Sequence, residues 1–175
     1  GDLTLSAGTF ALGTNNLILG DDFISNGAIT TGVGSTFTFN GSATLTGATV
    51  AAFRNLTVNG DFTPSLSYNV SGSYMVGPGA TVNAGSGTVT FNGATAVTVG
   101  ALGTMNLNIV TIAANSSLTA PSGTMGIAGN LNFSNNTTST FNHNNGTILF
   151  NGTTNLGVNA TKIFNNVTVS GSLAN

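Results

Sequence analysis

The sequence contains no cysteine, no tryptophan and no glutamate, and only 3% of its residues are charged, against about 25% in an average globular protein. A chain without cysteine has neither a disulfide framework nor a thiolate metal site. Arg54 and Lys162 are the only cationic residues, and the net charge is −2. Binding to nucleic acid or to an anionic membrane surface needs clustered lysine and arginine, so we expect neither as a partner. No apolar run approaches the length of a membrane span, so we expect no membrane insertion.

Strong helix formers are also scarce, because the chain lacks glutamate and glutamine and has one lysine and one arginine. Threonine, asparagine, serine and glycine supply the polarity instead. The branched Cβ of threonine suits strands, whereas asparagine and glycine suit tight turns. Apolar and polar residues alternate over short runs such as Phe37/Phe39 and Leu56/Val58, which is typical of strands with one buried face. These features predict an all-β protein with many short strands.

Two short phrases recur along the chain. The first ends in Phe-Asn-Gly, and the second starts with an asparagine that precedes alternating apolar residues. Their asparagines are, for the first phrase, Asn40, Asn92 and Asn151, and for the second, Asn16, Asn55, Asn106 and Asn166. Each first phrase precedes a second phrase by a nearly constant distance along the chain. This regularity predicts one repeat-built β domain over residues 1–175, with units of roughly 1–41, 42–93 and 94–152 and a partial unit 153–175.

Repeats of this kind predict a β-solenoid, a parallel β-helix in which each short strand stacks on its equivalent in the next coil. The second phrase recurs at intervals that lengthen along the chain, from Asn16 to Asn55, then to Asn106 and then to Asn166. A coil of about 20 residues gives two coils in the shortest interval and three in the longest. The alternative is an antiparallel sandwich or jelly roll with strand exchange, in which the six Asn-Gly pairs mark hairpins.

The first phrase also predicts core residues. Phe39, Phe91 and Phe150 occupy the same place in the alternating pattern, so we expect all three to point inward at equivalent positions.

The asparagines have a predicted structural role. Those of the second phrase are candidates for an amide ladder, in which each side chain donates to the next; a preference for left-handed turns is the alternative explanation. Those of the first phrase are expected in turns.

The sequence offers little to build a catalytic or metal site. Asp21 and Asp61 occupy related places in two repeats, and with Asp22 they are candidate calcium ligands, with turn capping as the competing interpretation. Hydrolysis of a glycosidic bond needs two paired carboxyl groups, and a nucleophilic triad needs a base. His143 is the only histidine and is expected in a loop. We therefore predict a non-enzymatic protein without a cofactor.

Three segments resemble a known class of proteins: Gly87–Gly93, Phe53–Gly60 and Ile163–Val169. They resemble the "beta strand repeat" regions of giant bacterial surface proteins, and they are similar to parts of haemagglutinin-like adhesins and autotransporter passengers. The resemblance covers nearly the whole chain. It implies a parallel β-helix, a secreted or cell-surface location, and a role in adhesion or surface architecture. It brings no functional residues with it.

The expected function is therefore that of an extracellular structural protein, a segment or subunit of a surface fibre or adhesin stalk. A carbohydrate-binding adhesin module is the first alternative, with Tyr68 and Tyr74 as the only amphipathic rings. An ice-binding protein is the second, because Thr36/Thr38 and Thr88/Thr90 form Thr-x-Thr pairs. Eleven Asn-x-Ser/Thr sequons make glycans candidate modifications.

The terminal strands predict self-association. Leu3 and Leu5 near one end, and Val167 and Val169 near the other, alternate like ordinary strand residues and have no capping helix beside them. An unprotected strand edge pairs readily with another strand. We therefore expect these edges to meet a second copy of the chain, head to tail, or the adjoining part of a longer chain.

Overall fold

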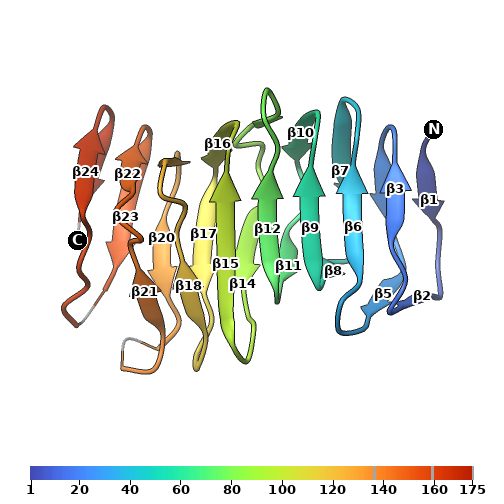
Figure 1. The fold of residues 1–175 in the computed structure, drawn as a ribbon, viewed down its shortest axis with the longest axis horizontal. Helices are drawn as coiled ribbons and strands as arrows, with labels where there is room; N and C mark the ends of the chain where they lie inside the picture. Colours follow the sequence, from blue (N-terminus) through green and yellow to red (C-terminus); the bar gives the residue numbers. More distant parts are fainter. Residues whose placement is uncertain (136, 159, 175) are drawn as a thin grey trace.

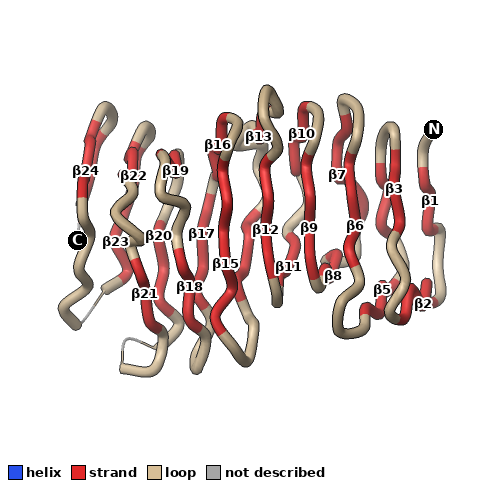
Figure 2. The backbone as a smooth tube through the Cα atoms, in the orientation of Figure 1, coloured by secondary structure: helices blue, strands red, loops and turns tan. Residues whose placement is uncertain are grey.

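The computed structural model describes residues 1–135, 137–158 and 160–174, and these residues form strands but no helix. The chain winds into a β-solenoid of about eight turns, with its two ends at opposite ends of the long axis (Figures 1 and 2). Successive coils pair in parallel, as in Leu3 with Phe23 at one end and Phe150 with Val169 at the other. The solenoid prediction is therefore confirmed. The antiparallel sandwich is wrong, because the Asn-Gly pairs turn corners between sheets and form no hairpins.

Each coil has three sides, which we call A, B and C in chain order. Side A is one sheet of β1 (Leu3–Leu5), β4 (Phe23–Ser25), β7 (Ala43–Gly47), β10 (Asp61–Pro64), β13 (Thr81–Val82), β16 (Thr104–Leu107), β19 (Thr124–Ile127), β22 (Thr147–Phe150) and β24 (Asn166–Val169). Side B has the pair β2 (Thr9–Gly13) and β5 (Ala28–Thr31), then β8 (Ala51–Phe53), β11 (Tyr68–Val70), β14 (Thr88–Phe91), β17 (Ile109–Ile112), β20 (Leu131–Phe133), β23 (Thr153–Gly157) and β25 (Ser172–Ala174). Side C has β3 (Leu17–Leu19), β6 (Thr36–Phe39), β9 (Asn55–Val58), β12 (Ser73–Val76), β15 (Ala96–Ala101), β18 (Ser117–Thr119) and β21 (Thr140–Asn142).

The length of a coil varies between turns. The coil from Thr81 to its partner Thr104 is longer than the coil from Thr147 to its partner Asn166. The extra residues lie in the corners, so the strands keep their register. Both coils agree with the predicted length of about 20 residues.

The recurring phrases do not stack on one another. Asn40 follows β6 on side C, Asn92 follows β14 on side B, and Asn151 follows β22 on side A. The interval from Asn55 to Asn106 likewise moves from side C to side A. Every corner needs a strand end followed by a tight turn, so one local phrase serves at all three corners. The sequence unit 1–41 holds β1 to β6 and is two whole coils, whereas units 42–93 and 94–152 hold eight strands each and are not whole numbers of coils.

The interior is one continuous hydrophobic core. Phe39, Phe91 and Phe150 are all fully buried, each at the end of its strand and each on a different side of the solenoid. They point inward as expected, at places that are equivalent in the local pattern but lie on different sides. Alternation along each strand puts such residues inside and leaves threonine, serine and asparagine outside.

Glycine is required where consecutive corners lie against each other. At Gly41 an added Cβ would overlap the carbonyl oxygen of Gly20 in the coil before it, and at Gly60 it would overlap that of Gly41. The obstacle is backbone in both cases, so it cannot move aside without disturbing the ladder. These corners therefore hold neighbouring coils at strand spacing only because the side chain is absent.

We predict that Gly41→Ala lowers the free energy of unfolding by about 1–3 kcal/mol, because the new methyl group forces two coils apart. Gly123→Ala is the matched control, since the nearest atom to its added Cβ is 3.5 Å away. Chemical denaturation of both variants measures the difference. Equal stability of the two variants would contradict the close contact at Gly41.

Candidate functional site

The acidic residues lie mainly at the corner between sides C and A and do not form a cluster. The Oδ1 atom of Asp22 accepts hydrogen bonds from the backbone N–H of Thr44 at 2.7 Å and from its hydroxyl at 3.0 Å. Asp22 thus ties its coil to the next one. Asp21 lies in the turn before β4, whereas Asp61 begins β10, and strand β7 lies between these two strands.

The calcium candidate is therefore wrong as a cluster. Two strand spacings, about 9.5 Å, separate the backbones of β4 and β10. Within the described residues, no group of three or more histidine, cysteine, aspartate or glutamate side chains is placed to hold a metal ion. His143 lies in a turn, where its Nδ1 accepts the N–H of Asn145 at 3.0 Å.

The predicted asparagine ladder is replaced by a different arrangement. Asn16 and Asn55 lie on side C, but Asn106 and Asn166 lie on side A, so the four cannot form one column. The side chain of Asn16 instead accepts the backbone N–H of Thr36 in the next coil at 2.9 Å. An amide of this kind joins two coils without meeting another amide.

The amide of Asn55 joins three successive coils on side C. It donates to the carbonyl of Ser35 in the coil before it at 2.9 Å, and it accepts both the N–H and the hydroxyl of Ser73 in the coil after it at 3.0 Å. Direct contact between two amides occurs elsewhere. Asn59 donates to Asn40 at 2.9 Å, and Asn151 donates to Asn106 at 3.1 Å.

The outer surface of the strands is almost free of charge. Asp61 is the only charged residue within any strand of the described residues. On side A, the register aligns four threonines from consecutive strands in one row: Thr81, Thr104, Thr124 and Thr147. The row was not visible in the sequence, because unequal coils space these threonines irregularly.

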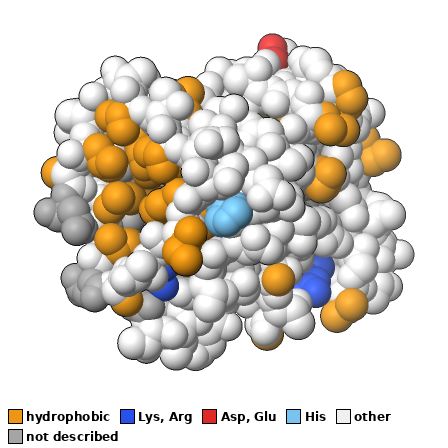
Figure 3. Space-filling model, turned by 60° about the vertical axis from the view of Figure 1, so that its left-hand side comes forward, with side chains coloured by type: hydrophobic (Ala, Val, Ile, Leu, Met, Phe, Trp, Pro, Cys, Tyr) orange, Lys and Arg blue, Asp and Glu red, His pale blue; other side chains and the backbone are white. Residues whose placement is uncertain are grey.

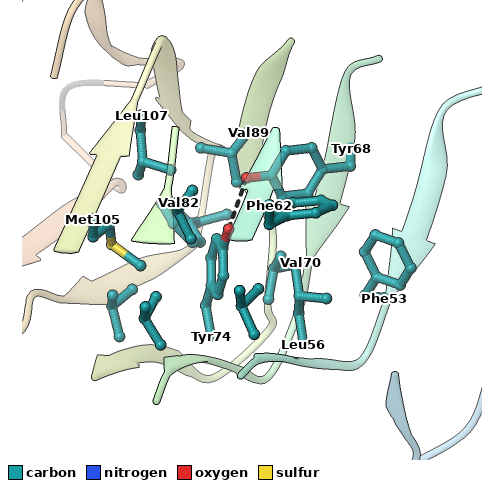
Figure 4. Close-up of a cluster of buried hydrophobic side chains, with 14 of the residues drawn as sticks. Phe53, Leu56, Phe62, Tyr68, Val70, Tyr74, Val82, Val89, Met105 and Leu107 are labelled. Atoms are coloured by element: carbon teal, nitrogen blue, oxygen red, sulfur yellow. Dashed lines mark hydrogen bonds between the residues drawn. The ribbon is translucent and has the colours of Figure 1, made fainter. Parts of the chain in front are cut away.

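The two tyrosines form a buried pair in the core (Figure 4). Their hydroxyl oxygens are 3.2 Å apart, and both side chains are fully buried. They end a run of rings in contact that begins at Phe23 and passes through Phe37, Phe39 and Phe62. Desolvation by burial raises the pKa of both phenols well above their usual value of 10.0.

The tyrosine pair predicts a loss of stability at high pH. The folded-state pKa values are raised, so the pair has no effect on pH dependence below the unfolded pKa near 10. Above it, only the unfolded chain releases the protons, and stability falls by about 1.4 kcal/mol per pH unit for each tyrosine. Urea denaturation at a series of alkaline pH values measures this slope.

The double variant Tyr68→Phe/Tyr74→Phe serves as the control for that prediction. It removes both hydroxyls together, so it leaves no unpaired buried partner and changes the stability at neutral pH little. Its alkaline slope is expected to be much flatter. A slope as steep as that of the original chain would show that other groups control the alkaline loss.

One buried hydroxyl has no partner in the described part of the chain. It is the Oγ1 atom of Thr154 in β23, whose side chain is 1% exposed. A buried polar group without a hydrogen bond costs about 1–3 kcal/mol. Strand β23 therefore contains a local defect at Thr154. Leu173 of the next strand, β25, pairs with Thr154 in the register.

We predict that Thr154→Val raises the free energy of unfolding by about 1 kcal/mol, because it replaces the unpaired hydroxyl with a methyl group. Thr44→Val makes the same chemical change where the hydroxyl bonds to Asp22, and it is expected to destabilise the protein instead. Thermal or urea unfolding distinguishes the two. A destabilising Thr154→Val would indicate that the hydroxyl is bonded in solution.

The predicted assembly residues lie on the edge strands of side A. Leu3 and Leu5 belong to β1 and are half-buried. Val167 and Val169 of β24 align with the buried Ile148 and Phe150, yet they are 46% and 47% exposed, because no described strand follows β24 on this side. Figure 3 shows hydrophobic side chains gathered on the surface at this end of the molecule.

Comparison of the chain with protein families, with curated proteins and with solved structures gives no match. Among the described residues there is no helix with the length and hydrophobicity to cross a membrane.

Proposed function

We propose that this chain is a structural, non-enzymatic segment of an extracellular surface fibre or adhesin stalk. The observation that carries the proposal is the parallel stack of strands on three sides, which runs without a break from β1 to β24 on side A, with an apolar interior and almost no charge on the strands. Such a solenoid grows in one dimension, since each coil contacts mainly its neighbours. Each added coil lengthens the rod by about 4.8 Å, the spacing between strands.

The contacts of the polar side chains and the scattered positions of the ionisable groups support a structural role. Asp22, Asn16 and Asn55 use their side chains to join coils. The ionisable groups described here are few and are not gathered around a common point, which favours the non-enzymatic assignment. The secreted location rests on the resemblance of the recurring phrases to bacterial surface proteins.

The two alternative functions have less support. Stacking of sugars on aromatic rings favours exposed tyrosine or tryptophan, but Tyr68 and Tyr74 are buried in the core. For ice binding, Thr36/Thr38 lies on β6 and Thr88/Thr90 lies on β14, so the two Thr-x-Thr pairs face different directions. A matching face would need such pairs in consecutive coils of one side.

The proposed partner is a strand that continues the stack at each end, from a second copy or from the adjoining part of a longer chain. β24 offers an open strand edge together with exposed apolar residues that face the same way as the core below it. A further strand on this edge would bury Val167 and Val169 and satisfy the open backbone groups. That combination favours pairing over exposure to water.

We predict concentration-dependent, end-to-end association of the purified chain, which light scattering and electron microscopy detect as lengthening rods. Val167→Lys places a charge on the open edge and is expected to weaken association at least several-fold. Val33→Lys is the matched control, because Val33 is 79% exposed in a corner between sides B and C. A chain that stays monomeric at high concentration would contradict association through the ends, as would equal effects of both variants.

A further inference from the structure

Six corners of the solenoid carry an Asn-Gly pair, and this pair has its own chemistry. The backbone nitrogen after an asparagine attacks the side-chain amide carbon most readily when the next residue is glycine, because no Cβ obstructs the approach. The six asparagines are Asn26, Asn40, Asn59, Asn92, Asn145 and Asn151. All six are exposed, so solvent access does not distinguish them.

The side-chain hydrogen bonds do distinguish them. Asn26 accepts the N–H of Ala48 at 3.0 Å, and Asn40 accepts the amide of Asn59 at 2.9 Å. Asn151 is held by Asn106 at 3.1 Å. Each of these bonds joins the amide to another coil and keeps it away from the backbone nitrogen that follows it.

Asn145 is restrained in another way. The nitrogen of Gly146, which would act as the nucleophile, donates its hydrogen to the carbonyl of His143 at 2.9 Å. The side chain of Asn145 has no hydrogen bond within the described residues, but the nucleophile beside it is occupied.

Asn92 lacks both restraints. Its backbone N–H is anchored to the carbonyl of Val70 at 3.1 Å, as in the other corners. Its side-chain amide, however, has no hydrogen bond to any described residue, and neither has the nitrogen of Gly93. The two reacting groups of this corner are therefore both available.

We propose that Asn92–Gly93 is a site of spontaneous deamidation, and that hydrogen bonds between or within coils protect the other Asn-Gly corners. The nitrogen of Gly93 forms a bond to Cγ of Asn92, and the bond from Cγ to the amide nitrogen breaks. Ammonia leaves with the proton that Gly93 gives up, and a succinimide ring remains. Water opens the ring to aspartate or isoaspartate, so no reactant other than water is needed.

The modification changes the corner between β14 and β15. It adds a negative charge where the neighbouring strands carry none. Isoaspartate also adds a methylene group to the backbone, beside a glycine at which even a Cβ would overlap the carbonyl oxygen of Ser71. This corner is therefore where chemical ageing first loosens the stack.

The test is peptide mapping by mass spectrometry after incubation of the folded chain in mildly alkaline buffer, with a second sample incubated in denaturant. In the folded chain, Asn92 is expected to convert several-fold faster than Asn40 and Asn59. In denaturant, the rates of all the Asn-Gly pairs are expected to converge. Equal rates at Asn92 and Asn40 in the folded chain would overturn the proposal.

A variant tests the protecting bond directly. Asn59→Ala removes the donor to Asn40 but keeps the backbone bond from residue 59 to Phe39. Deamidation at Asn40 is then expected to accelerate several-fold, towards the rate at Asn92, while Asn92 itself is unchanged. Circular dichroism establishes that the variant is folded. An unchanged rate at Asn40 in the folded variant would refute protection by the amide pair.

Discussion

The parallel backbone ladder between successive coils is the constraint on which the rest of the structure depends. Strands pair in parallel with their equivalents one turn away, so each paired residue lies directly over a residue of the neighbouring coil. Each inward side chain must therefore pack against the inward side chain at the same position of the neighbouring coil. Each corner must likewise pack against the corner of the neighbouring coil. The buried apolar side chains, the glycines of the corners and the amides that reach to the next coil all meet this one requirement.

The corners make the ladder compatible with an irregular sequence. Coils of unequal length coexist because the additional residues project at corners, where they leave the strand register unchanged. Gly41 shows how narrow the remaining tolerance is, since its carbonyl neighbour leaves no room for a methyl group. Variation in length is thus allowed at the corners, but close contact between stacked corners restricts the residue type.

The sequence contains enough information to predict the strands, the parallel solenoid and the approximate length of a coil. Alternation marks the buried side chains, and Phe39, Phe91 and Phe150 lie in the core for that reason. Alternation does not indicate which of the three sides a strand occupies, because all three sides need the same short alternating strand followed by a tight turn. The ladder from Asn16 to Asn166 was therefore wrong, and the row from Thr81 to Thr147 was missed. The pairing of Tyr68 with Tyr74 depends on side-chain directions inside the core, which no local pattern encodes.

The contact between Asn106 and Asn151 joins coils that are not neighbours. Strand β19 lies between them, and Gly126 at that place has no side chain, so the amide of Asn106 extends over the intervening coil to Asn151. In a stack with only nearest-neighbour contacts, each coil opens against the one before it, and fraying proceeds one turn at a time. A bond across two interfaces removes that independence locally. The coil that contains Asn151 must break this bond as well as its ladder with β19 before it opens, so fraying from that end meets an added local cost of about 1 kcal/mol.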